Sequence, residues 1–216
     1  MVKLDIIADP ACPWCYVGKG YLDRALEKAG DHPFEIEYHP FQLRPDMPKG
    51  GMDRGELMEQ VFGSKKRAAE AHVVLEEHAK NAGVTFNFEK ITRSPNTFDA
   101  QRLIYWAGLE QRQAFVVSAI MKAYWAEGRD IGDHEVLIDI AKGCEMDPEM
   151  VRRLLESDAD VDSIAKREAH SRHMGITSVP TFVVGNRHAV PGAQPTELWL
   201  DVMKDIASQD REESAE

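Results

Sequence analysis

The chain has 216 residues, of which 43% are hydrophobic, so it can bury a full core as one domain or as one domain with an insertion. Its 26 lysines and arginines are outnumbered by 37 aspartates and glutamates, and the net charge of −11 argues against nucleic acid as a partner. No run of about 18 apolar residues predicts a membrane span, and charges at Lys3 and Asp5 interrupt any signal-peptide core, so we expect a cytoplasmic protein without a membrane partner.

The first predicted elements are a strand over residues 4–8 and a helix over residues 13–29. The segment between them, from Asp9 to Cys15, reads Asp-Pro-Ala-Cys-Pro-Trp-Cys and places Cys12 at or just before the first helical turn. Free backbone N–H groups and the helix dipole stabilise a thiolate at such a position. In a cytosolic protein, Cys-X-X-Cys is typical of redox catalysis or metal binding rather than of a structural disulfide. Cys12 and Cys15 are therefore predicted to form a redox dithiol.

A second strand is predicted over residues 34–41, where apolar and polar residues alternate, and it completes a β-α-β opening. The apolar period then becomes helical as far as residue 171, and Asp147-Pro148-Glu149 has the order expected at a helix start. Residues 179–190 predict a hairpin with Gly185-Asn186 at its turn, and a helix follows over residues 195–207. We therefore assign 1–46 and 172–208 to one discontinuous domain, 47–171 to an inserted helical domain, and 209–216 to a disordered acidic tail.

The dithiol after the first strand, the helical insertion and the hairpin that opens at Val179-Pro180-Thr181 together resemble the thioredoxin fold in its DsbA-like form. Four blocks resemble the FrnE-like branch: Cys12-Pro13-Trp14-Cys15, Asn96-Thr97 with Arg102-Leu103, the segment from Ala123 to Ile131, and Gly192-Ala193-Gln194-Pro195. The resemblance implies an α/β, thioredoxin-like fold with a large helical insertion between its N-terminal βαβ and C-terminal ββα halves. It also implies a thiol-disulfide oxidoreductase that acts on protein or small-thiol substrates without a bound cofactor, with glutathione as a candidate co-substrate.

The resemblance also assigns roles to residues of this chain. Cys12 is then the attacking and more exposed sulfur, and Cys15 resolves the mixed disulfide. Pro180 is cis and faces the dithiol, Val179 holds substrate backbone as an added strand, and Trp14 places an apolar ring beside the sulfurs. Asp9 is a candidate proton relay, with turn chemistry as its alternative. The candidate pocket residues are Asn96, Thr97 and Arg102, although helix capping also explains Asn96.

Three other interpretations of the site remain open. Kappa-class glutathione transferases and 2-hydroxychromene-2-carboxylate isomerases share the fold, but typically have Ser where this chain has Cys12 and a Ser-Asp pair where it has Ala193-Gln194. A zinc site would need Cys12 and Cys15 with His170 and His173, 155 residues further on, and the strand and helix that flank the cysteines favour the redox fold instead. The third interpretation is a non-enzymatic binding module that keeps the thioredoxin fold as a scaffold, and such a module would need neither thiol. We interpret Cys144 as a packed residue, and both a monomer and a homodimer fit the sequence.

Overall fold

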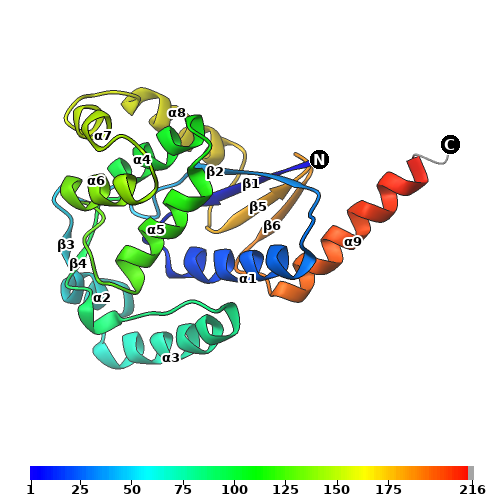
Figure 1. The fold of residues 1–216 in the computed structure, drawn as a ribbon. Helices are drawn as coiled ribbons and strands as arrows, with labels where there is room; N and C mark the ends of the chain where they lie inside the picture. The colour runs from blue at the N-terminus through cyan, green and yellow to red at the C-terminus, as the bar shows by residue number, and fades with distance from the viewer. Residues whose placement is uncertain (214–216) are drawn as a thin grey trace.

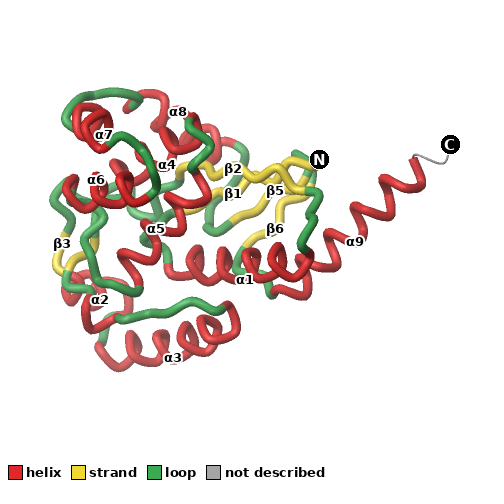
Figure 2. The backbone as a smooth tube through the Cα atoms, in the orientation of Figure 1, coloured by secondary structure: helices red, strands yellow, loops and turns green. Residues whose placement is uncertain are grey.

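A computed structural model describes residues 1–213, which contain a four-stranded sheet with the strand order β2-β1-β5-β6 (Figures 1 and 2). The central strand β1 pairs in parallel with β2 and antiparallel with β5, and β5 pairs antiparallel with β6. The mixed α/β architecture of a thioredoxin-like fold with a helical insertion is confirmed. The strands are β1 (Val2–Ala8), β2 (Phe34–Pro40), β5 (Thr181–Val184) and β6 (His188–Pro191).

One face of the sheet packs against α1 (Pro13–Ala29) and α9 (Thr196–Glu213). Ile6 of β1 is opposite Phe182 of β5, and the Phe182 ring meets Trp199 of α9 edge to face at 4.7 Å between ring centroids. Ile6, Phe182 and Trp199 are at most 2% exposed. Because side chains alternate along a strand, the neighbouring residues of β1 and β5 point to the opposite face of the sheet.

The segment between β2 and β5 is mainly helical, as the apolar period predicted. Two strands of two residues each also pair within it, and they are too short to show the alternation that identifies a strand in sequence. No helix among residues 1–213 is both long enough and apolar enough to span a membrane. The elements of the insertion are β3 (Met52–Asp53), α2 (Arg54–Phe62), α3 (Lys65–Ala82), a 3₁₀ turn (Phe88–Lys90), β4 (Arg93–Ser94), α4 (Phe98–Leu109), α5 (Gln113–Trp125), α6 (His134–Gly143), α7 (Pro148–Leu155) and α8 (Val161–His173).

Helix α3 of the insertion lies alongside α1, the helix that begins at the dithiol (Figure 1). Val17 and Tyr21 of α1 pack with Leu75 and Ala82 of α3 in a small apolar cluster. Since apolar burial contributes roughly 25 cal/mol per Å², this contact holds the insertion against α1. The insertion is thus part of the environment of the dithiol.

The predicted domain limits need two corrections. Helix α8 runs from Val161 to His173, so the predicted boundary between residues 171 and 172 falls inside a helix. Helix α9 continues past Ala207 to Glu213, so the predicted disordered tail is helical over residues 209–213. These residues include no glycine or proline and are mostly good helix formers, which allows the helix to continue. Residues 214–216 of the predicted tail lie outside the described residues.

Candidate active site

The two cysteines lie at the N-terminus of α1. Cys12 is the N-cap residue, and its carbonyl accepts hydrogen bonds from the backbone N–H groups of Cys15 at 3.1 Å and Tyr16 at 3.3 Å. Pro13 occupies the first turn, where a missing N–H costs no helical hydrogen bond. The cysteines are free thiols that lie 3.6 Å apart. A small movement of the side chains would therefore bring the sulfurs to the distance of about 2.05 Å found in a disulfide.

Exposure hardly separates the two cysteines, so the prediction that Cys12 is the more exposed one stays a prediction. Cys12 is 3% exposed and Cys15 is 2% exposed. Both residues belong to the main apolar core, which reaches as far as the N-terminus of α1. The environment of each thiol, rather than its exposure, distinguishes the two cysteines.

The loop before β5 supplies the contact to Cys12. The Val179–Pro180 peptide bond is cis, and the Cys12 thiol donates a hydrogen bond to the Val179 carbonyl at 3.6 Å. The hydroxyl of Thr181 donates to the Ser178 carbonyl at 2.8 Å and closes the turn. Residues that are 167 positions apart in sequence thus meet at the dithiol.

Gly18 of α1 allows this loop to approach the helix. A Cβ atom at position 18 would lie 3.1 Å from Cγ of Pro180, 3.3 Å from Cα of Ala193 and 3.4 Å from the Phe182 ring. The pyrrolidine ring and the Ala193 backbone are rigid, so the loop would have to move. Sequence reasoning did not identify Gly18; a glycine inside a helix, where it costs up to about 1 kcal/mol relative to alanine, was the available signal.

We expect Gly18→Ala to destabilise the fold by roughly 1–2 kcal/mol because the added methyl group crowds Pro180. Gly143→Ala is the matched control: Gly143 also lies in a helix, but no atom is within 4 Å of an added Cβ. The control should gain up to about 1 kcal/mol from helix propensity. Urea unfolding of both variants measures the difference, and equal stabilisation by the two substitutions would contradict the proposed close packing.

Asp9 lies beneath the dithiol and is 3% exposed. Its two carboxylate oxygens accept from the backbone N–H of Ala11 at 2.9 Å and of Leu43 at 2.7 Å, and the Thr97 hydroxyl also bonds to the carboxylate. Burial raises the pKa of Asp9 to about 6, although these hydrogen bonds oppose the shift. The Asp9 carbonyl accepts from the Cys12 N–H at 2.9 Å. Asp9 therefore both shapes the turn and can exchange a proton near neutral pH.

The Cys15 thiol is buried beside Asp9. Burial raises its pKa well above the usual range, and the neighbouring Cys12 raises it further, while a backbone hydrogen bond from Asp9 acts in the opposite direction. Cys15 is therefore held as a neutral thiol near neutral pH. This is the behaviour expected of a resolving cysteine rather than of an attacking one.

Trp14, which lies between the two cysteines, contacts the insertion. Its ring meets the His78 ring of α3 edge to face at 5.1 Å, and Nδ1 of His78 is hydrogen-bonded to the Tyr21 hydroxyl at 3.0 Å. Trp14 is partly buried. The residue predicted to border the substrate thus also anchors α3 to the N-terminal end of α1.

The other predicted accessory residues, Asn96 and Arg102, have partners of their own. Oδ1 of Asn96 accepts from the Phe98 N–H at 2.9 Å, and Nδ2 donates to the Met47 carbonyl at 2.6 Å, so Asn96 stabilises the start of α4. The buried Arg102 guanidinium donates to carbonyls around the α7–α8 connection, including Leu154 at 2.6 Å and Ser157 at 2.7 Å. The structure therefore gives Arg102 a structural role and does not direct it to the dithiol.

Two side chains that were not among the predicted site residues, Trp125 and Gln101, join the insertion to the segments next to the cysteines. The Trp125 indole N–H donates to the Pro10 carbonyl at 3.0 Å. The Gln101 amide donates to the Ala8 carbonyl at 3.0 Å and to the Phe41 carbonyl at 3.2 Å, at the ends of β1 and β2. Both donors are on helices far from the cysteines in sequence, so no local pattern could reveal these two contacts, although Trp125 lies in one of the blocks that carry the resemblance.

The four ligands of the alternative zinc site do not come together. Within the part of the chain that the structure describes, the cysteines and His170 or His173 form no group with ligand atoms within 4.8 Å of one another. Cys144 is partly buried at the end of α6, and burial raises the pKa of its thiol. Its position is that of a packed, weakly reactive cysteine.

Comparisons with known proteins agree with this architecture. YwbO of Bacillus subtilis (strain 168), described as uncharacterized, is 26% identical over 206 residues, which cover 94% of this chain and 96% of that protein. The crystal structure of the probable DsbA oxidoreductase SCO1869 from Streptomyces coelicolor has a TM-score of 0.82 and 29% identity, and covers 95% of this chain and 89% of that one.

Two structures with lower identity share the fold. The cytosolic disulfide reductase DsbM from Pseudomonas aeruginosa, solved with GSH, has a TM-score of 0.66 and 19% identity over 95% of this chain and 99% of that one. A 2-hydroxychromene-2-carboxylate isomerase has a TM-score of 0.75 and 17% identity, and the match covers 97% of this chain and 98% of that one. The model of the DSBA-like thioredoxin domain family matches residues 3–204. With the dithiol, the hairpin and the insertion all inside this range, the chain belongs to the DSBA-like thioredoxin domain family.

Proposed function

We propose that this protein is a thiol-disulfide oxidoreductase that uses Cys12 and Cys15 as its dithiol. One observation carries the proposal: two free thiols 3.6 Å apart lie at a helix N-terminus, and the first of them contacts the Val179 carbonyl before Pro180. That arrangement provides an attacking sulfur, a resolving sulfur and a backbone edge for substrate. A zinc site, by contrast, would require further ligands near the cysteines.

The proposed reaction is a two-electron exchange. The Cys12 thiolate attacks one sulfur of a substrate disulfide, forms a mixed disulfide and releases the other substrate sulfur as a thiolate. Cys15 then loses its proton and attacks Cys12, which releases the second substrate thiol and leaves the Cys12–Cys15 disulfide. The substrate disulfide is reduced to two thiols while the dithiol is oxidised, and the reverse sequence oxidises a dithiol substrate.

We assign Asp9 as the base that takes the Cys15 proton. Its pKa, raised by burial to about 6, makes the carboxylate a competent proton acceptor at neutral pH. The negative charge of Asp9 also raises the pKa of the Cys15 thiol, which places the two groups within electrostatic reach of each other. Val179 is assigned to hold substrate backbone by strand addition, and Trp14 to border the substrate. Pro180 closes the site without offering a metal ligand or a competing thiol.

Glutathione is the proposed small-thiol partner, because the similar fold of DsbM was solved with GSH. We propose a cytoplasmic location on the ground that reduced glutathione is abundant there. Trp14 brings no positive charge to the dithiol, so we expect a reduction potential between about −120 mV and about −270 mV, the values of strongly oxidising and strongly reducing members of the superfamily.

The test is equilibration of the purified protein with buffers of reduced and oxidised glutathione, with the Cys12–Cys15 disulfide quantified by mass spectrometry after acid quenching. A reversible two-electron couple that is lost in Cys12→Ser supports the oxidoreductase. The measured potential also shows whether the protein is a net reductant or oxidant against the cytosolic pool.

A glutathione-dependent transferase or isomerase is the second candidate, favoured by the fold shared with a 2-hydroxychromene-2-carboxylate isomerase. In that case no internal disulfide forms in the glutathione buffers, and Cys12 is recovered only as a glutathione adduct. Such a result would reject the dithiol mechanism.

A further inference from the structure

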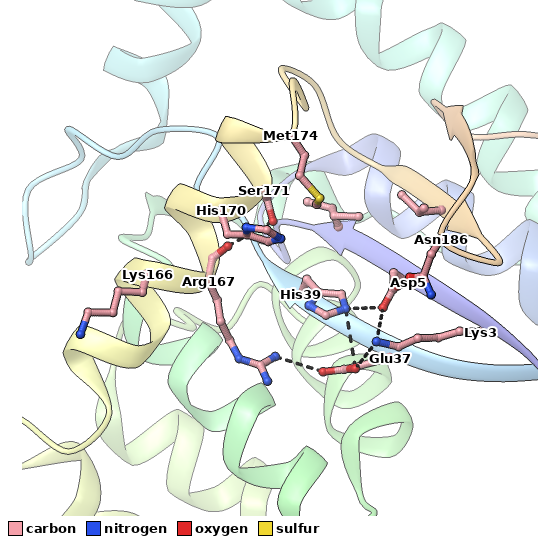
Figure 3. Close-up of a pocket in the computed structure, with 12 residues that line it drawn as sticks. Lys3, Asp5, Glu37, His39, Lys166, Arg167, His170, Ser171, Met174 and Asn186 are labelled. Carbon is pink, nitrogen blue, oxygen red and sulfur yellow. Dashed lines mark hydrogen bonds and ion pairs between the residues drawn. The ribbon is translucent and has the colours of Figure 1, made fainter.

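A cavity lies on the face of the sheet opposite α1 and α9. Its volume is about 520 Å³, and strands β1, β2 and β5 and helix α8 line it (Figure 3). Ile7 and Val183 are apolar parts of the lining, and Met174 lies at the end of α8. None of the residues that line this cavity belongs to the candidate active site. Asp5 is nevertheless only four residues before Asp9 in the sequence.

Three of the side chains that line this cavity can bind metal and lie close together. Asp5 of β1 is paired in register with Glu37 of β2, and His39 follows two residues later on the same face of β2. Their ligand atoms all lie within 4.8 Å of one another, and Figure 3 shows the three side chains converging. Nε2 of His39 is 2.6 Å from Oδ1 of Asp5 and 3.8 Å from Oε2 of Glu37.

The protein's own cation already occupies this cluster. Nζ of Lys3 is 3.0 Å from both Oδ1 of Asp5 and Oε2 of Glu37. The Lys3 side chain is 39% exposed and flexible, so it can leave toward solvent, whereas the Asp5 side chain is 11% exposed and is fixed on the central strand. The cluster thus offers a buried carboxylate on the central strand, a second carboxylate beside it and a displaceable cation.

Arg167 of α8 orients the second carboxylate. Its guanidinium donates to Oε1 of Glu37 at 3.0 Å, which leaves Oε2 directed at Lys3 and His39 (Figure 3). Burial raises the pKa of Glu37, but hydrogen bonds from Arg167 and Lys3 outweigh it and hold that pKa below its usual value. Outer hydrogen bonds of this kind commonly orient the carboxylates of metal sites.

We propose that Asp5, Glu37 and His39 bind a divalent transition-metal ion such as Zn²⁺ in place of the Lys3 ammonium group. Zn²⁺ accepts imidazole and carboxylate ligands at about 2.0–2.2 Å, which separates ligand atoms by about 3.3 Å in a tetrahedral site. The distances of 2.6 and 3.8 Å from His39 Nε2 lie on either side of this value, so side-chain rotations suffice. Three protein ligands would leave a fourth position free, the arrangement of sites that bind water or a further ligand.

The test uses Co²⁺ as a spectroscopic probe in the full chain with Cys12, Cys15 and Cys144 replaced by serine, so that thiolates contribute no metal binding. We expect one Co²⁺ per chain, with visible absorption bands of a nitrogen- and oxygen-ligated ion, and displacement by Zn²⁺. His39→Gln should weaken binding by about tenfold or more. His188→Gln, a change at an exposed histidine of β6, should leave the affinity unchanged.

Lys3→Met separates a metal site from a simple ion-pair cluster. If a metal replaces the ammonium group, removing that group should tighten Co²⁺ binding. If Asp5 and Glu37 serve only as partners of Lys3, the variant should lose stability and show no gain in affinity, which overturns the proposal. Electron paramagnetic resonance of Mn²⁺ with the wild-type chain provides a second measurement, because Mn²⁺ binds thiols weakly; binding that persists unchanged in His39→Gln also overturns it.

Discussion

Cys15→Ser should accumulate one covalent glutathione per chain, attached to Cys12, when the variant is incubated with oxidised glutathione. Cys12 can still attack the disulfide, but the serine cannot resolve the product, because a hydroxyl does not displace a thiolate from a disulfide under these conditions. Catalysed exchange should fall to the rate of the reaction without enzyme. Intact-mass spectrometry and peptide mapping after acid quenching measure the adduct and its position.

Two variants serve as controls for this trapping experiment. Cys12→Ser should lose catalysed exchange and form no adduct, whereas Cys144→Ser should keep both exchange and the internal disulfide. Burial of the Cys144 thiol raises its pKa and makes it a poor nucleophile. An adduct found on Cys144, or one that survives in Cys12→Ser, would show that the attacking sulfur has been assigned incorrectly.

Asp9→Asn should change how stability depends on pH. The folded pKa of Asp9 is about 6, above the value of about 3.9 in an unfolded chain. Between these values the folded state binds more protons than the unfolded state, so the contribution of Asp9 to stability falls as pH rises from about 4 to about 6. The shift of about two pKa units corresponds to roughly 3 kcal/mol. The free energy of unfolding of Asp9→Asn relative to wild type should therefore rise by about that amount between pH 4 and pH 7.

The pH-dependent difference separates the charge of Asp9 from its hydrogen bonds. Asparagine cannot accept both the Ala11 and the Leu43 N–H through separate oxygens, and the orphaned donor costs about 1–3 kcal/mol at every pH. The free energy of unfolding of both proteins is measured with urea at several pH values. The difference between the two proteins at each pH cancels the contributions of the other titrating groups. Asp31→Asn, at an exposed aspartate, is the control. If the stability of Asp9→Asn relative to wild type depends on pH no more than that of Asp31→Asn, the pKa of Asp9 is not strongly raised in the folded state.

The parts of the fold that the sequence predicted best are those with strong local signals. The helix predicted over residues 13–29 is α1 with the same limits. The start of α7 is confirmed: Oδ1 of Asp147 accepts from the Glu149 and Met150 N–H groups, and Pro148 is in the first turn. The hairpin was anticipated from its Gly185-Asn186 turn, and both residues have positive φ. Capping, turn chemistry and apolar period are properties of neighbouring residues, so a single sequence records them.

The parts that the sequence did not reveal depend on contacts between distant segments. The burial of Cys12 follows from packing that joins the end of β1, α1 and the loop before β5, and no residue near Cys12 encodes it. The bonds from Trp125 to Pro10 and from Gln101 to Ala8 likewise depend on how the insertion docks. The role of Arg102 was predicted from a motif, but its direction is set by the carbonyls of a connection more than 50 residues later.

The bonds of Gln101 bear on the order in which the site is completed during synthesis. Cys12 and Cys15 emerge from the ribosome long before Gln101 and Val179. The Gln101 amide joins the ends of the first two strands, and the Val179 carbonyl contacts Cys12. A nascent chain that stops short of the hairpin therefore has both cysteines but lacks the Val179 backbone that we propose as the substrate-binding edge. The contact between Cys12 and the Val179 carbonyl can therefore form only after the segment that leads into β5 has emerged, late in translation.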